Sequence, residues 1–154
     1  MAPHPYILEQ SLGYAMGRAT RALTTLVSHN FIKAGFDVTC EQWSVLVNLG
    51  KKNGQSQQGL ANLTCKDKTT MTRLIDNMEK HSLVVRIPDK SDKRQKLIYL
   101  TKKGRDLQEK LTIVIQQTLI EAQKSINVKD LDTCKKVLNQ VYENINCNQT
   151  ERGS

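Results

Sequence analysis

The chain has 154 residues, of which 38% are hydrophobic and 25% charged, and its formal net charge is +8. These values exclude a mainly disordered chain and favour one globular domain with a real core. No apolar run reaches the roughly 18 residues of a membrane span, and no signal-peptide pattern opens the chain. The sequence therefore predicts a cytoplasmic protein without a membrane partner.

The first expected element is a long helix over residues 5–32. Proline at position 5 suits a first helical turn, and apolar residues recur at helical spacing from residue 8 to residue 27. Gly35 ends this pattern. A second helix is expected from Thr39, which has capping-box spacing with Gln42.

Two further helices are expected after an Asn53-Gly54 turn signal. Ser56 can cap a short helix, and Asp67 is a good N-cap for the next one. The helix after Asp67 has a buried stripe formed by apolar residues spaced i, i+3, i+4 and i+7: Met71, Leu74, Ile75 and Met78. Its opposite face is polar and carries few carboxylates, which suits contact with DNA.

Two short strands and two long helices complete the chain. Residues 84–87 and 97–100 are rich in β-branched and apolar side chains, and the charged loop between them predicts a β-hairpin. Thr101 is expected to cap a helix over residues 102–125. In the last helix Asp130 lies in the first turn, and apolar residues repeat with the 3-4 spacing of a coiled coil.

A short helix, a turn, an amphipathic helix and a charged hairpin in this order describe a winged helix-turn-helix. The predicted fold class is therefore mainly α, with a small β-hairpin wing and a helical dimerisation lobe. Residues 66–105 contain twelve Lys and Arg against five Asp and Glu, which is nearly the whole positive excess. A localised basic stretch of this kind indicates a polyanionic partner, most often nucleic acid.

The same segments resemble the MarR (multiple-antibiotic-resistance regulator) family. Residues 92–101 match the family's wing signature and are followed by its usual glycine, Gly104. Residues 68–76 resemble its recognition helix, and residues 41–43 resemble the start of an earlier helix of the family. The resemblance covers residues 5–146. Ser82 departs from the family pattern, because a glycine commonly ends the recognition helix there.

The resemblance implies a homodimer that binds a palindromic operator in double-stranded DNA as a sequence-specific transcriptional repressor. It implies one MarR-type domain over residues 5–146, with a DNA-binding lobe over 36–105 and dimerisation helices over 5–34 and 106–146. By position, Asp92 would brace Arg94, which would contact DNA. The candidate DNA-binding residues lie on the recognition helix and the wing: Lys68, Thr69, Thr70, Thr72, Arg73, Asn77, Lys90, Asp92, Lys93, Arg94 and Lys96.

Other readings stay open beside this one. A winged-helix protein-interaction module and a nonspecific architectural DNA binder are the alternatives. A small aromatic effector is a further candidate partner, since many relatives bind one. Cys40 and Cys147 are the candidates for a redox role, whereas Cys65 and Cys134 are expected at packing positions. No cofactor, metal or enzymatic activity is expected, because the sequence has no metal-ligand spacing, phosphate loop or nucleophile motif.

Overall fold

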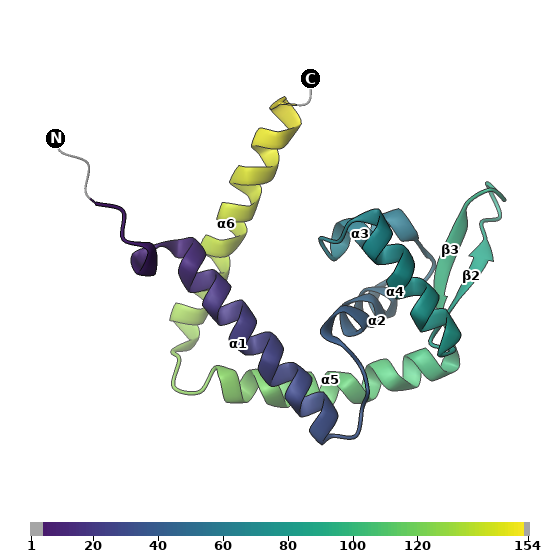
Figure 1. Cartoon of the computed structure of the whole chain (residues 1–154), viewed down its shortest axis with the longest axis horizontal. Coiled ribbons are helices and arrows are strands. Elements are labelled where there is room, and N and C mark those ends of the chain that lie inside the picture. The colour runs from purple at the N-terminus through teal and green to yellow at the C-terminus, as the bar shows by residue number, and fades with distance from the viewer. Residues whose placement is uncertain (1–4, 153–154) are drawn as a thin grey trace. The chain divides into compact units, whose positions relative to one another are not determined.

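The computed structural model of this chain describes residues 5–152, with side chains described for residues 5–146. Figure 1 shows that the described part is mainly helical, with one small sheet. The elements in chain order are a 3-10 turn η1 (Leu8–Gln10), α1 (Leu12–Lys33), α2 (Cys40–Lys51), β1 (Gln55–Ser56), α3 (Gln57–Leu63), α4 (Lys68–Lys80), β2 (Val84–Pro88), β3 (Lys96–Leu100), α5 (Lys102–Ala122) and α6 (Val128–Arg152). The predicted fold class, a winged helix-turn-helix with additional long helices, is confirmed.

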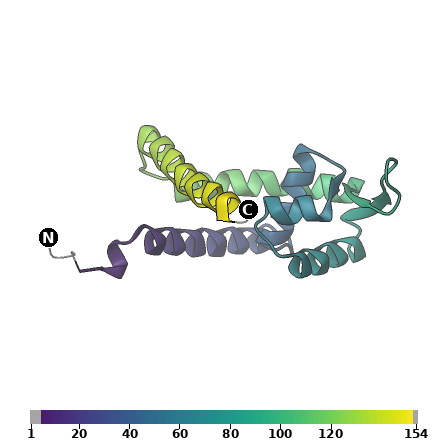
Figure 2. The same ribbon diagram turned by 90° about the horizontal axis from the view of Figure 1, so that it is seen from above.

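The chain divides after Leu119 into two compact units. The first unit holds α1, the winged-helix elements and most of α5, and the second holds the end of α5 and α6. Within the first unit the hairpin of β2 and β3 projects at the end remote from the start of α1 (Figure 2). No helix in the described part of the chain is long and apolar enough to span a membrane.

The first helix begins later than the sequence predicted. It starts at Leu12 rather than near residue 5, because the side chain of Ser11 accepts a hydrogen bond from the backbone N–H of Tyr14 and caps the helix there. At the other end Gly35 has φ +85°, and the N–H of Phe36 donates to the carbonyl of Phe31. This left-handed glycine closes the helix, as the sequence predicted.

The predicted caps of the next helices are confirmed. Thr39 and Gln42 form a reciprocal capping box at the start of α2. Ser56 caps α3 by accepting from the N–H of Gly59, and Asp67 caps α4 by accepting from the N–H of Thr70. These caps set the residue at which each of the three helices begins.

The sheet has three antiparallel strands in the order β1-β3-β2. The hairpin was predicted, but the two-residue strand β1, which pairs Gln55 with Ile98, was not. The turn before β1 is held by the side chain of Asn53, which accepts from the N–H of Leu100, and by Gly54 at φ +77°. The first turn of α3 is therefore attached directly to the wing sheet.

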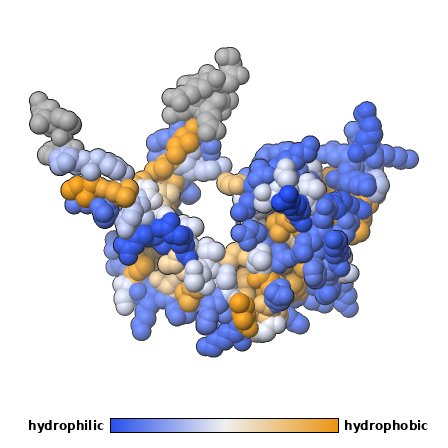
Figure 3. Space-filling model, viewed as in Figure 1, coloured by the Kyte–Doolittle hydropathy of each residue, from blue (hydrophilic) through white to orange (hydrophobic). Residues whose placement is uncertain are grey.

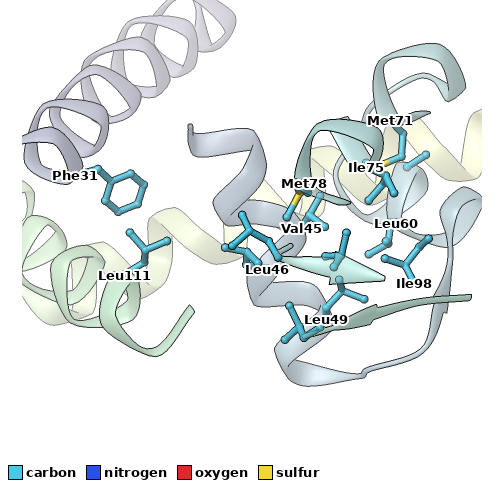
Figure 4. Close-up of a cluster of buried hydrophobic side chains, with 14 of the residues drawn as sticks. Phe31, Val45, Leu46, Leu49, Leu60, Met71, Ile75, Met78, Ile98 and Leu111 are labelled. Carbon is cyan, nitrogen blue, oxygen red and sulfur yellow. The ribbon is translucent and has the colours of Figure 1, made fainter. Parts of the chain in front are cut away.

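One apolar core fills the winged-helix elements and extends to α1 and α5. Its members from α2 and α4, among them Leu46, Leu49, Met71 and Ile75, point toward one another in Figure 4 and are fully buried. The predicted stripe of α4 is therefore confirmed. Farther along, Phe31 of α1 belongs to the same cluster as residues of α5.

A buried hydrogen bond to α1 and a close backbone contact at its first turn hold α5 in the first unit. Thr118 is buried, and its hydroxyl accepts a hydrogen bond of 2.9 Å from the side-chain amide of Asn30 on α1. Thr101 caps α5 as predicted, since its hydroxyl accepts from the N–H of Gly104. A Cβ at Gly104 would lie 2.0 Å from the carbonyl oxygen of Leu83, so only glycine fits at this position.

Candidate nucleic-acid interface

The helix-turn-helix consists of α3, residues 64–67 and α4. The turn closes through Cys65, which has φ +53°, and the N–H of Lys66 donates to the carbonyl of Ala61 at 3.0 Å. This is the hydrogen-bond pattern that ends a helix at a left-handed residue. Cys65 is exposed, so the prediction that it packs inside was wrong. The turn needs its backbone conformation rather than a buried thiol.

Asp67 sets the start of α4. Its carboxylate accepts from the hydroxyl of Thr70 at 2.6 Å and from the N–H of Thr70 at 2.8 Å. These hydrogen bonds, the side-chain one first, hold the pKa of Asp67 below its ordinary value of 3.8. The hydroxyl of Thr70 is therefore engaged in the cap, although Thr70 was predicted to face DNA.

The outward face of α4 carries exposed cationic and hydroxyl side chains. Lys68, Thr69 and Arg73 are exposed, and within the described residues their side chains have no hydrogen bond or ion pair. Thr72 is half-buried, and its hydroxyl is shared between the carbonyl of Lys68 and the side-chain amide of Gln57 on α3. Thr69 and Arg73 are thus free to meet a partner, while Thr72 is fixed at the edge of the face.

Asn77 lies on the side of α4 that faces α2. Its side-chain oxygen accepts a hydrogen bond of 2.8 Å from Gln42 at the start of α2. Asn77 is exposed one helical turn after Arg73, but its side-chain oxygen is already paired within the protein.

The wing presents an unusually exposed arginine. The Arg94 side chain is 93% exposed, and its Nε donates to Asp92 Oδ1 at 3.2 Å. The same oxygen accepts from the backbone N–H of Arg94 at 3.1 Å. Among the described residues, no group pairs with the two terminal nitrogens of the guanidinium. Asp92 and Arg94 are therefore in the contact that the family resemblance implied.

Three lysines lie close to this pair in the sequence, and the projecting hairpin is hydrophilic in Figure 3. Lys90, Lys93 and Lys96 are all exposed and take part in no ion pair among the described residues. Cations without internal partners keep their charge available to an anion. The wing and the outward face of α4 are thus both positively charged and both accessible.

Arg86 is the residue that the sequence reasoning missed. It lies in β2, where its guanidinium donates to Asp76 and Glu79 of α4, each at 2.6 Å. The sequence did contain a signal for it. Arg86 is two residues after Val84 in the strand and so lies on the same, inner face, where an arginine needs partners. The few carboxylates of α4 are therefore paired.

A cavity of about 440 Å³ lies next to the C-terminal half of α4. Its lining combines apolar, amide and cationic groups from the segment before α2, from α4 and from α5: Gly35, Phe36, Asp37, Val38, Thr39, Gln42, Asn77, His81, Leu83, Lys103 and Leu107. Lys103 Nζ donates to the carbonyl of His81 at 3.0 Å. Among the described residues, no cluster of His, Cys, Asp and Glu could hold a metal ion.

The cysteines are separate from one another. Cys40, at the start of α2, is half-buried, and its sulfur lies 3.5 Å from Ser28 Oγ. Cys134 is exposed on α6, so within one chain it does not pack inside as the sequence predicted. The side chain of Cys147, the other redox candidate, lies outside the described residues.

Comparisons with known proteins agree with the fold of this chain. Residues 38–96 match the model of the MarR family. BpsR of Bordetella bronchiseptica is similar to this chain with TM-score 0.83 and 21% identity, over 91% of this chain and 99% of BpsR. The repressor CouR, in a structure bound to a 23-mer DNA duplex, is similar with TM-score 0.80 and 24% identity, over 88% of this chain and 94% of CouR. MarR of E. coli is similar with TM-score 0.73 and 22% identity, over 89% of this chain and 98% of MarR. The resemblance to the MarR family is confirmed over residues 38–96, and the similarity in fold to the solved structures covers most of the chain.

Proposed function

We propose that this chain, with its MarR-type winged helix, is a sequence-specific DNA-binding transcriptional repressor that acts as a homodimer on a palindromic operator. The observation that carries the proposal is the pairing of two accessible cationic surfaces, the outward face of α4 and the wing tip at Arg94. A major groove about 12 Å wide accepts one helix, and a narrow minor groove attracts arginine. The DNA-bound CouR structure has the same fold.

The residues divide into two roles. Thr69 and Arg73, with Lys68 and Thr72 at the edges, would meet base edges and phosphates in the major groove. Arg94 would enter the adjacent minor groove, and the wing lysines would meet the backbone. Thr70 and Asn77 remain in the proposed interface as flanking residues, since their side chains already have partners on the protein. Asp92 would act by aiming Arg94.

The experiment selects bound duplexes from a random DNA pool and then measures affinity by fluorescence anisotropy at several salt concentrations. We expect a palindromic motif and a steep fall of affinity with salt, because each neutralised phosphate releases counterions. Arg94→Ala should weaken binding to the selected duplex by about tenfold. The matched control is Lys51→Ala, which removes the same charge from an exposed position at the end of α2, outside the proposed dimerisation helices. Undiminished binding by a folded Arg94→Ala dimer would refute the wing assignment.

The same experiment separates the alternatives. An architectural binder would yield no enriched motif and would bind selected and scrambled duplexes equally at fixed salt. A protein-interaction module would bind neither duplex. The present proposal requires preference for the selected duplex.

The homodimer is supported by apolar side chains that one chain leaves exposed. On α1, Leu12 is 47% exposed, and on α6, Tyr142 is 60% and Ile145 is 55% exposed. A two-fold axis would place the two α4 helices about 34 Å apart, which is one turn of DNA. The proposed domain is the one MarR-type domain over residues 5–146, with dimerisation helices on both sides of the winged helix.

The cavity beside α4 favours regulation by a small aromatic effector. Phe36, Leu83 and Leu107 give it apolar walls, and Asn77 belongs both to its lining and to α4. For BpsR, regulation of DNA binding by 6-hydroxynicotinic acid is described. We expect a compound of this class to lower DNA affinity here, and Val38→Phe, which narrows the cavity, to reduce that response. An effect of the compound that Val38→Phe leaves unchanged would place the effector elsewhere.

A further inference from the structure

The guanidinium of Arg86 joins the wing to two helices. Besides the bonds to Asp76 and Glu79, its Nη2 donates to Gln57 Oε1 on α3 at 3.3 Å. Its backbone N–H also donates to Glu79 Oε1 at 3.2 Å. The Arg86 side chain is only 17% exposed, against 93% for Arg94. Arg86 is therefore directed at the protein, not at a partner in solution.

The network continues onto the outward face of α4. Gln57, which accepts from Arg86, donates through Nε2 to the hydroxyl of Thr72 at 2.6 Å. The bonds from Arg86 and Gln57 thus reach α4 at Thr72, Asp76 and Glu79, over two turns of the helix. A planar guanidinium donates in fixed directions, so these bonds set the orientation of β2 relative to α4.

The same arginine also controls charge at this face. Asp76 and Glu79 are the carboxylates of α4, and their side chains are 52% and 39% exposed. Unpaired, they would repel DNA phosphates beside the cations of the outward face. Arg86 pairs with both, so the face keeps its net positive character.

We propose that Arg86 is a positioning residue for sequence readout. Without contacting DNA, it holds the wing strand at the orientation relative to α4 that lets Arg94 and Arg73 reach adjacent grooves together. This inference rests on the proposed DNA-binding function. Its distinctive consequence is that loss of Arg86 harms discrimination between duplexes more than it harms affinity for DNA in general.

The test compares a selected duplex with a scrambled duplex of the same length, at fixed salt and below the melting temperature of every variant. Arg86→Gln leaves two carboxylates unpaired, so we expect roughly threefold weaker binding to both duplexes. Misplacement of the wing should weaken binding to the selected duplex by about a further tenfold. Lys51→Gln, at an exposed position at the C-terminal end of α2 and outside the proposed dimerisation helices, removes one positive charge as the control and should change neither affinity.

Arg86→Lys keeps the charge and guards against misfolding of the first variant. A single ammonium cannot bridge Asp76, Glu79 and Gln57 in fixed directions. We expect wild-type affinity for the scrambled duplex and several-fold weaker binding to the selected one. Unchanged discrimination in both variants, with only a lower melting temperature, would show a merely structural role and overturn the proposal. A wild-type protein that does not prefer the selected duplex would instead refute the proposed function.

Discussion

The winged helix and the last helix differ in where their apolar side chains go. In α2 and α4, Leu46 and Ile75 are fully buried within one chain. In α6 none of the described residues is buried, and Val137, Tyr142 and Ile145 are at least 49% exposed. The first region completes its core by itself, while the second leaves an apolar seam that a second copy would cover. Within one chain the winged helix therefore has a complete apolar core, whereas the described part of α6 keeps an exposed apolar face.

The largest effect is expected when the seam of α6 is broken. Ile145→Asp places a carboxylate at a position that the proposed dimer buries, and two-fold symmetry places it there twice. We expect the dimer to dissociate about a thousandfold more readily, as measured by analytical ultracentrifugation. The chain should remain folded, since Ile145 is 55% exposed in one protomer.

Asn139→Asp provides the control, because Asn139 is exposed on another face of α6. It adds the same charge and should leave the mass in solution unchanged. A monomeric wild-type protein, or an Ile145→Asp protein that stays dimeric at low concentration, would contradict the proposed role of α6.

The next effect tests the self-contained region. In Gly104→Ala the new Cβ would lie 2.0 Å from the carbonyl oxygen of Leu83. A backbone carbonyl cannot move aside as the end of a flexible side chain can. We therefore expect the free energy of unfolding to fall by about 3 kcal/mol. Denaturant titration at fixed protomer concentration measures it.

Gly13→Ala is the matched control for that substitution. Among the described residues, nothing lies within 4 Å of a Cβ at Gly13, the second residue of α1. Alanine should therefore stabilise the helix by up to about 1 kcal/mol. Equal effects of the two substitutions would mean that the contact at Leu83 does not limit residue size.

A smaller gain in stability is expected at the end of α4. Ser82 has φ +59°, and the N–H of Leu83 donates to the carbonyl of Met78. Ser82→Gly relieves the left-handed strain, and we expect the free energy of unfolding to rise by about 0.5–1 kcal/mol. The same change at Ser44, inside α2, should lower it by a similar amount. Loss of stability at Ser82 would show that the serine makes a compensating contact.

The smallest effect concerns the cap of α4. Because the pKa of Asp67 is lowered in the folded chain, its cap stabilises the fold above the unfolded pKa. That contribution is lost as pH falls through the folded pKa. Thr70→Val removes the strongest cause and should move the pKa of Asp67 toward 3.8, as followed by an NMR titration of its carboxyl. An unmoved pKa would assign the shift to the backbone N–H instead.

Local chemistry explains how much of the fold could be predicted. Thr39, Ser56 and Asp67 cap their helices as expected, because side-chain capping needs only residues within the next turn. The contact between Asp92 and Arg94 was implied by the resemblance to the MarR family, and it too is local, because the two residues are two positions apart. Whether these residues bind DNA remains a prediction.

Long-range contacts explain the rest. The bond between Arg86 and Gln57 joins residues 29 apart, and Asn77 bonds to Gln42 across 35 positions. Neither pairing leaves a periodic pattern in the sequence. The start of α1 was misplaced because Pro5 and the apolar spacing outweighed Ser11, a cap that is visible in the sequence but has no glutamate or glutamine partner.

The pairing of β1 with β3 has a mechanical consequence. Gln55 and Ser56 are strand residues of the wing sheet, and Ser56 is also the N-cap of α3. Bending the hairpin away from the body would therefore pull apart the first turn of α3 and disturb the helix-turn-helix itself. A signal that releases DNA would meet less resistance by tilting this whole assembly as a rigid piece than by flexing the hairpin alone.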